Sequence, residues 1–296
     1  MSQTITTHAW MNFPKARTNR VLDSILKRGN KNYEKAFQAD SAVVYWNAES
    51  LGISRVNAYQ DAPLAVQTRI LEDCTFALLR EAFAIERAGM AFAAKMVLLA
   101  DDLQSRLLYS QFAAQEAAHY QAIAAYIPNE PEDLASDPFL SVLKDAIEIG
   151  GRMSLTLIIQ VFLEGWGLLH YKKLQKDCLD PGLAEEFRLI LQDEAHHHGS
   201  GVALLDLKEW SDEDRDFTLT TLKKLLTMVA SGPWTIASIL QTHLAPTASP
   251  TIFFKELRHH QETSIKLQQL RRILEVGGAE TLALALAHDH AFTPGE

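Results

Sequence analysis

Two long segments without proline, residues 64–127 and 139–180, constrain the fold of this chain more than any other feature. In the first segment Leu71, Leu78, Leu79 and Phe83 recur at the i, i+3, i+4 spacing of an amphipathic helix. Alternating apolar runs closed by Asn-Gly or Asp-Gly turns, the usual signature of strands, do not occur. The chain is therefore predicted to be all-α.

Proline and glycine positions predict where the helices begin and end. The predicted core helices cover residues 63–101, 102–127, 138–176 and 181–207, with the loop 128–137 as the clearest break. Further helices are predicted over 17–27, between 214 and 250 with breaks at 231–233 and 245–250, over 250–275, and from 280. No Gly/Ser-rich linker divides the chain. We therefore expect one domain over residues 1–296, with a four-helix core at 63–207 and extra helices in 1–62 and 208–296.

Charge and composition narrow the possible partners. The formal net charge of −9 argues against nucleic acid or an anionic membrane as partner. Residues 1–24 lack the apolar core of a signal peptide. The most apolar run, 155–163, is shorter than the roughly 20 residues of a membrane-spanning helix. Cys74 and Cys178 are expected to be buried thiols in a reducing cytoplasm, so a cytoplasmic protein without a membrane span is predicted.

The helix pair occurs twice, and the same ionisable residues recur in both copies. The segment QEAAHY at 115–120 aligns with DEAHHH at 193–198. Thirty residues before the glutamate of each segment stands another glutamate, followed three positions later by glycine (Gly89 and Gly167). The repeated set, Glu–30–Glu–3–His, consists of Glu86, Glu116 and His119 in the first copy and Glu164, Glu194 and His197 in the second.

Helix geometry predicts that these six side chains point inward. A Glu and a His three residues apart share one helix face, and the neighbouring positions on that face are apolar. Buried carboxylates without a partner are costly and repel one another. Two divalent cations would offset four carboxylates, and oxygen with imidazole ligands suits iron or manganese.

The triple histidine at 196–198 is the least usual part of this pattern. An expression tag would lie at a terminus and be longer, so that interpretation is rejected. Alignment with the first copy favours His197 as the ligand. His198 then takes the place of Tyr120, near the site and not on a metal. His196 lies about 200° around the helix from Glu194 and is expected to face solvent or another helix.

A glutamate from each of two helices and Glu-x-x-His from the other two is the ligand pattern of di-iron and di-manganese helix bundles. Residues 63–207 therefore resemble the ferritin-like di-iron carboxylate superfamily. The resemblance implies a ferritin-like four-helix bundle and a metal ligand set in two halves. One metal is held mainly by Glu86, Glu116 and His119, and the other by Glu164, Glu194 and His197, with the glutamates of the Glu-x-x-His pairs as bridges.

The resemblance also implies outer residues. In related proteins, the residue before the glutamate of one Glu-x-x-His contacts the histidine of the other. Here Asp193 would hold His119, and Gln115 would hold His197. An ordinary surface acid is an equally open interpretation of Asp193.

The predicted function is an O₂-dependent di-iron oxygenase or oxidase that acts on a small, largely apolar organic molecule. Its cofactor would be two iron ions, with an Fe/Mn or Mn₂ centre left open, and its O₂ chemistry implies an electron donor such as a reductase or ferredoxin. Small residues beside the ligands leave room for a substrate. The candidate pocket residues are Phe83, Phe112, Phe162, Trp166 and His198, although aromatic residues at helical spacing are more often plain core.

Other functions of such bundles fit less well or stay open. A ferroxidase or storage ferritin is a shorter chain, and a di-manganese catalase uses the same ligands. The tyrosine position of ribonucleotide reductase radical subunits is Ile123, and the extra histidine position of arylamine N-oxygenases is Ile190. A metal-free scaffold would leave six inward ionisable groups unexplained. The substrate, the electron donor and the oligomeric state, a homodimer included, are left open.

Overall fold

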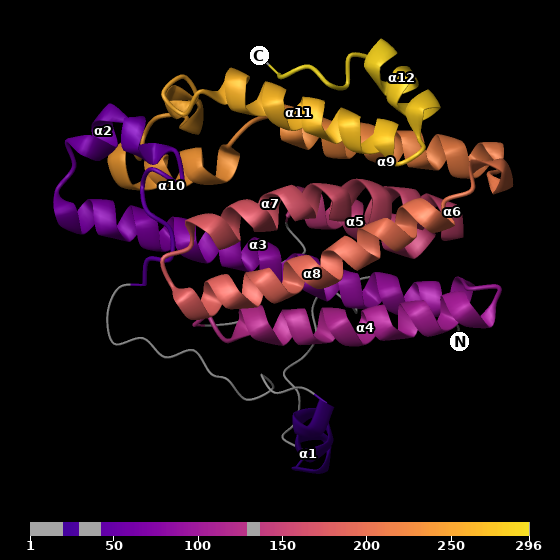
Figure 1. The fold of residues 1–296 in the computed structure, drawn as a ribbon. Helices are drawn as coiled ribbons and strands as arrows, with labels where there is room; N and C mark the ends of the chain where they lie inside the picture. The colour runs from indigo at the N-terminus through magenta and orange to yellow at the C-terminus, as the bar shows by residue number, and fades with distance from the viewer. Residues whose placement is uncertain (1–19, 30–42, 129–136, 296) are drawn as a thin grey trace, which may run out of the picture. The chain divides into compact units, whose positions relative to one another are not determined.

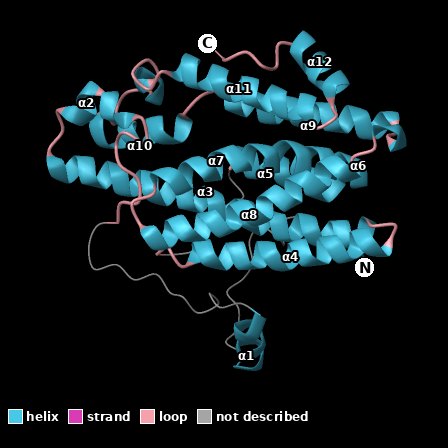
Figure 2. Ribbon diagram, viewed as in Figure 1, coloured by secondary structure: helices cyan, strands magenta, loops and turns pink. Residues whose placement is uncertain are grey.

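The computed structural model describes residues 20–29, 43–128 and 137–295. All regular elements in these ranges are helices, and no strand occurs there (Figures 1 and 2). The all-α prediction is therefore confirmed.

The described chain consists of twelve α-helices and four shorter or wider helical segments. The α-helices are α1 (Arg20–Gly29), α2 (Asn57–Gln60), α3 (Leu64–Leu99), α4 (Leu103–Ala124), α5 (Pro138–Ile149), α6 (Arg152–Leu155), α7 (Glu164–Asp177), α8 (Pro181–Leu204), α9 (Asp212–Ala230), α10 (Trp234–Leu244), α11 (His259–Val276) and α12 (Glu280–His288). The others are the 3₁₀ turns η1 (Ile53–Arg55), η3 (Leu207–Glu209) and η4 (Pro250–Phe253), and η2 (Thr156–Leu163), which is a π-helix.

Aspartate caps define the starts of three core helices. Asp102 accepts a hydrogen bond from the Ser105 amide at 2.8 Å, and Asp180 accepts one from the Leu183 amide at 2.7 Å. Asp137 caps α5 in the same way. Such side chains satisfy amides that have no partner within the helix. Because these starts depend on local sequence, the predicted boundaries at 102, 138 and 181 agree with the structure within a residue.

The prediction of one continuous helix over 138–176 is wrong. Helix α5 ends at Ile149, Gly150 and Gly151 interrupt the chain, and a new helical run begins at Arg152. Two adjacent glycines weaken a helix, because glycine loses more conformational freedom than any other residue when it is held in a helix. Lys95 stabilises the break, since its Nζ donates to the carbonyl oxygens of Ile147 and Gly150 at 2.6 and 2.8 Å. Cationic side chains favour this position at a helix C-terminus.

The predicted helix over 250–275 also begins later than expected. Residues 250–253 form the turn η4, and α11 starts only at His259. Arg258, immediately before it, has a positive φ of 52°, a conformation that ends rather than continues a right-handed helix. The breaks at 231–233 and 245–250 are confirmed, and of the helix predicted at 17–27, residues 17–19 lie outside the described residues.

The chain forms two compact units. One comprises residues 1–38 and 79–152, and the other residues 39–78 and 153–296. The first contains α1, most of α3, α4 and α5, and the second contains the remaining described helices. Each copy of the Glu–30–Glu–3–His set thus falls within one unit, and the single-domain prediction stays a prediction.

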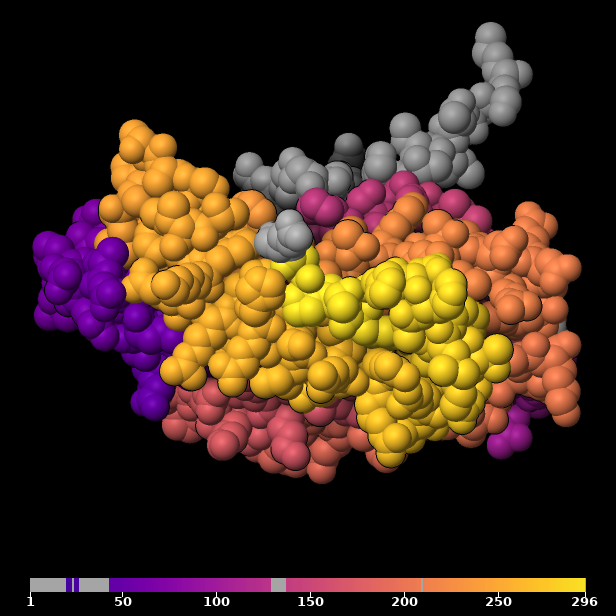
Figure 3. Space-filling view, turned by 90° about the horizontal axis from the view of Figure 1, so that it is seen from above, coloured from indigo at the N-terminus to yellow at the C-terminus, as the bar shows by residue number. Residues whose placement is uncertain are grey.

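The second unit is built around α7 and α8, which pack against each other. Trp46 attaches the segment that precedes α3 to both of these helices. Its Nε1 donates a hydrogen bond to the carbonyl oxygen of Leu174 in α7 at 2.9 Å, and its ring packs against that of Phe187 in α8. Helix α11 packs on α9 and α12, and Figure 3 shows these C-terminal helices on one face of the unit. Helix α8 approaches η2 so closely at Gly201 that a Cβ there would lie 2.4 Å from the Cβ of Gln160.

One helical run in the described residues, Arg152–Asp177, is long and apolar enough to cross a membrane by length and composition alone. The most apolar window of this run is 61% buried inside the protein. The buried central helix of a soluble protein meets the same criterion. The expectation of a chain without a membrane span therefore stays a prediction.

Two glycines of α8 should respond to alanine in opposite directions. Gly201→Ala places a methyl group against Gln160 and should lower the free energy of unfolding by about 1–3 kcal/mol. Gly199→Ala adds a methyl at an exposed position that no other described atom approaches within 4 Å, and should raise it by about 0.5–1 kcal/mol. Urea unfolding of the full chain followed by circular dichroism measures both. Equal shifts for the two variants would contradict the close packing of α8 on η2.

Candidate metal centre

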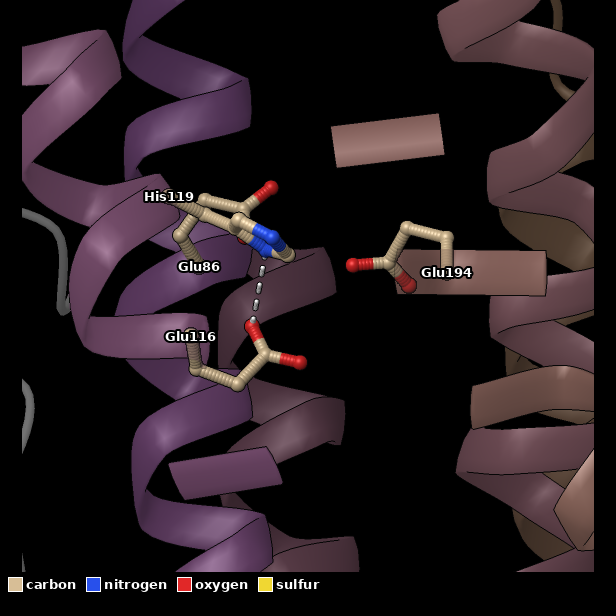
Figure 4. Close-up of side chains that lie close together, drawn as sticks. All are labelled: Glu86, Glu116, His119 and Glu194. Carbon is tan, nitrogen blue, oxygen red and sulfur yellow. Dashed lines mark hydrogen bonds and ion pairs between the residues drawn. The ribbon is translucent and has the colours of Figure 1, made fainter. Parts of the chain in front are cut away.

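Helices α3 and α4 bring together the three predicted ligands of the first copy. The side chains are almost completely buried, with exposed fractions of 1% for Glu86, 5% for Glu116 and 4% for His119. His119 Nδ1 lies 3.2 Å from Glu86 Oε2 and 4.0 Å from Glu116 Oε2 (Figure 4). We refer to these three residues as the first triad.

Gly89 shapes the first triad. A Cβ at this position would lie 2.3 Å from Glu116 Oε2, so the carboxylate occupies the space that any other residue would fill. In the second copy, a Cβ on the corresponding Gly167 would have no other described atom within 4 Å. The two glycines match in sequence, yet only the first makes room for a ligand.

Helices α7 and α8 bring together the ligands of the second copy, which form the second triad. Glu194 and His197 are 6% and 0% exposed, and Glu164 is half-buried. His197 Nδ1 lies 3.8 Å from Glu194 Oε2. Glu164 is the first residue of α7 and directly follows the π-helix η2. Because π-helical segments are rare and frequently found at functional sites, this position of Glu164 supports a functional role.

The three consecutive histidines have three different surroundings. His196 is exposed, His197 is fully buried beside Glu194, and His198 is half-buried. His198 Nδ1 lies 2.9 Å from the carbonyl oxygen of Gln160. This approach depends on Gly165, where a Cβ would lie 2.9 Å from His198 Cε1. The inward orientation of His197 and the outward orientation of His196 agree with the sequence analysis.

Gln160 is a residue that the sequence analysis did not single out. Its side chain is fully buried, and its Nε2 lies 3.2 Å from both the His197 carbonyl oxygen and Ser200 Oγ. Together with the His198 contact to its backbone, these bonds attach η2 to α8 at the second triad. The sequence does contain a signal for Gln160: it is the one amide side chain within the most apolar run, 155–163. A buried amide in such a run needs hydrogen-bond partners.

Asp193 and Gln115 are both half-buried. Their predicted hydrogen bonds would join residues of different units and stay predictions. That Phe83, Phe112, Phe162 and Trp166 line a substrate pocket also stays a prediction.

Two of these aromatic residues, Phe83 and Phe112, pack against other rings. Phe83 stacks on Tyr120 with ring centroids 4.5 Å apart, and Phe112 meets Tyr109 edge to face at 5.8 Å. Phe162 is buried and Trp166 is half-buried. Tyr109, the ring that Phe112 contacts, is also buried, and the sequence analysis did not name it.

Arg87 and His170 are further ionisable groups that lie outside the triads. Arg87, which directly follows Glu86 in α3, is 5% exposed. Burial, together with the charges of Lys266 and Lys173, lowers the pKa of His170 to about 4, so this imidazole is neutral at pH 7. A lone neutral histidine of this kind does not form a site.

The donor atoms of each triad suit a transition metal. Two ligand atoms at about 2.0–2.2 Å from one ion lie at most ~4.4 Å apart, and the His–Glu separations of 3.2, 4.0 and 3.8 Å fall within that distance. Two carboxylates with one imidazole are the ligands of iron or manganese rather than of a thiolate-bound metal.

Comparisons with protein-family models, with curated proteins and with solved structures found no match.

Single alanine variants should separate the roles of the three histidines. His196→Ala should change neither metal content nor stability, within about 0.5 kcal/mol, because the side chain is exposed. His198→Ala removes the contact with Gln160 and should cost about 0.5–1.5 kcal/mol. Only His197→Ala should lower the amount of bound iron. Urea unfolding and metal analysis on the same samples measure this, and iron loss with His196→Ala would contradict the assignment.

Proposed function

We propose that the protein is an O₂-dependent di-iron oxygenase or oxidase with a ferritin-like four-helix bundle at residues 63–207, in which each triad holds one iron ion. The observation that carries this proposal is the repetition of one arrangement: a buried histidine and two glutamates, with the same sequence spacing, in each unit. Chance placement of charged groups on helices does not favour burial, because each buried charge needs compensation.

The residues divide between the two ions. Glu86, Glu116 and His119 hold one, and Glu164, Glu194 and His197 hold the other. The resemblance to the di-iron carboxylate superfamily further implies that the two ions would act together on O₂. When bound, such a centre supplies the electrons with which O₂ is activated to oxidise an organic substrate, and an external electron donor restores the reduced state.

The surroundings of the triads support oxidation of a small, largely apolar molecule. Five of the six ligands are nearly inaccessible to solvent, which strengthens electrostatic interactions and excludes water from the reacting groups. The neighbouring residues Phe83, Ala88, Phe112 and Phe162 are buried and apolar. These side chains would be compatible with an apolar substrate beside the ligands.

Metal counting tests the site before any substrate is known. The protein is loaded with Fe(II) without oxygen, freed of excess metal and analysed by mass spectrometry. The wild type should hold about two iron ions per chain, and Glu116→Ala/His197→Ala should hold far less. Glu81→Ala/His196→Ala is the matched control, since it removes an exposed Glu from α3, which carries the ligand Glu86, and an exposed His from α8. Little iron in the wild type, or retention by the ligand variant, would refute the proposed site.

Oxygen chemistry then separates the alternatives. An oxygenase or oxidase should bind no more iron than the two triads hold and should consume O₂ repeatedly only with a reductant. Continued uptake of iron in air would instead identify a ferroxidase. Preferential retention of manganese, with disproportionation of hydrogen peroxide, would identify a di-manganese catalase.

The unequal glycines of the repeat give a second test. Gly89→Ala displaces the flexible end of Glu116 and should weaken iron binding by about tenfold or more while the fold persists. Gly167→Ala adds the same methyl at the matching position of the other copy, where no other described atom lies within 4 Å, and should leave binding unchanged. Titration with Fe(II) under anaerobic conditions measures both affinities. Equal affinities would show that Gly89 does not serve the first triad.

A further inference from the structure

The N-terminal helix α1 carries an exposed aliphatic face. Val21, Leu22, Ile25 and Leu26 are 67%, 54%, 60% and 45% exposed. At about 100° per residue, these four positions span roughly 140° of the helix surface. The exposed residues Arg20 and Ser24 lie outside this arc, so α1 is amphipathic, with its apolar side toward solvent.

The charge of the N-terminal region is opposite to that of the remaining chain. Residues 1–38 contain seven Lys or Arg and two Asp or Glu, which gives a net charge of +5. Since the whole chain has a net charge of −9, residues 39–296 carry −14. The net charge of the whole chain argues against an anionic partner, but it does not show that the basic residues are concentrated in the N-terminal region.

We propose that α1 is an interfacial helix that inserts its aliphatic face into a membrane surface containing anionic lipids. Amphipathic helices with aliphatic residues on one side and a basic surrounding sequence bind at the boundary between headgroups and acyl chains. In the sequence, the seven basic residues stand at positions 15–35, which include and flank the residues of α1. This distribution fits a broad anionic plane.

Other occupants of this face explain fewer of the observations. The four aliphatic side chains are 45–67% exposed in the structure, which is more than a face packed into a protein core would be. A groove on a partner protein needs the aliphatic residues and leaves the basic residues over positions 15–35 without a role. Nucleic acid accounts for the basic residues and leaves the aliphatic face without a role, because its binding relies on phosphate contacts and aromatic stacking.

The acidic remainder of the chain defines how such binding would operate. A region with a net charge of −14 is repelled by anionic lipid, so the attachment depends on the N-terminal segment alone. Four aliphatic side chains on one short helix give a weak and reversible attachment. Part of the attraction is electrostatic, and binding should therefore weaken as salt screens the charges.

Sedimentation of the full-length protein with vesicles tests this proposal. The vesicles contain either phosphatidylcholine alone or phosphatidylcholine with phosphatidylserine at a ratio of roughly 7:3, which models the anionic leaflet. Wild-type protein should sediment with the anionic vesicles, less so in high salt, and little with the neutral ones. Ile25→Glu should lower the partition coefficient by about tenfold or more, because it removes an aliphatic group that would insert into the lipid and adds a negative charge.

Ser24→Glu is the matched control, because it adds the same charge one residue away, outside the aliphatic arc. It should lower partitioning by less than about threefold, as expected for one charge at a screened surface. Absence of wild-type binding to anionic vesicles would overturn the proposal. Equal losses for the two variants would also overturn it, because charge alone would then explain binding. Light scattering tests whether the aliphatic face instead joins two copies of the chain. If the wild type does not bind vesicles but forms an oligomer that Ile25→Glu dissociates, the face is a protein interface. The result is independent of the metal content measured on the same samples.

Discussion

The burial of ionisable groups inside apolar helices is the constraint on which the rest of this structure depends. Glu86, Glu116, His119, Glu194 and His197 are each at most 6% exposed. Removing a carboxylate from water without compensation costs several kcal/mol or more, of order ~20 kcal/mol in the idealised limit. A protein keeps such groups only where hydrogen bonds, opposite charges or a metal offset the loss. The helices α3, α4, α7 and α8 hold the groups of each triad at fixed separations, where a metal ion could offset their charge.

Much of this arrangement could be predicted from the sequence, because it follows from the helical period. Once Glu194 is taken as inward, a spacing of three residues turns His197 inward and His196 outward, and the structure has them so. The capping aspartates Asp102, Asp137 and Asp180 also act through neighbours only two or three residues away. Features determined by residues close in sequence can be predicted from sequence alone.

Features determined by contacts between distant residues could not be predicted in the same way. The role of Gly89 depends on Glu116, and that of Gln160 depends on the backbone of His197, 37 residues later. Nothing local distinguishes Gly89 from Gly167, although only the former accommodates a carboxylate. The break at Gly150 and Gly151 was not predicted, because the apolar helical pattern continues on both sides of it. The π-helical form of η2 has no marker in its composition.

The two triads are alike in sequence and different in their surroundings, and this difference bears on which of the side chains can move. In the first triad, Gly89 holds the Glu116 carboxylate closely and Glu86 is 1% exposed. In the second, Glu164 is half-buried and follows a π-helix, whose wider turn interrupts the regular hydrogen-bond pattern of an α-helix. Rearrangement of a ligand is easier where the helix is already irregular and where the side chain borders solvent. The ligands of the second triad are therefore the ones more able to rearrange, while those of the first are held in place by their surroundings.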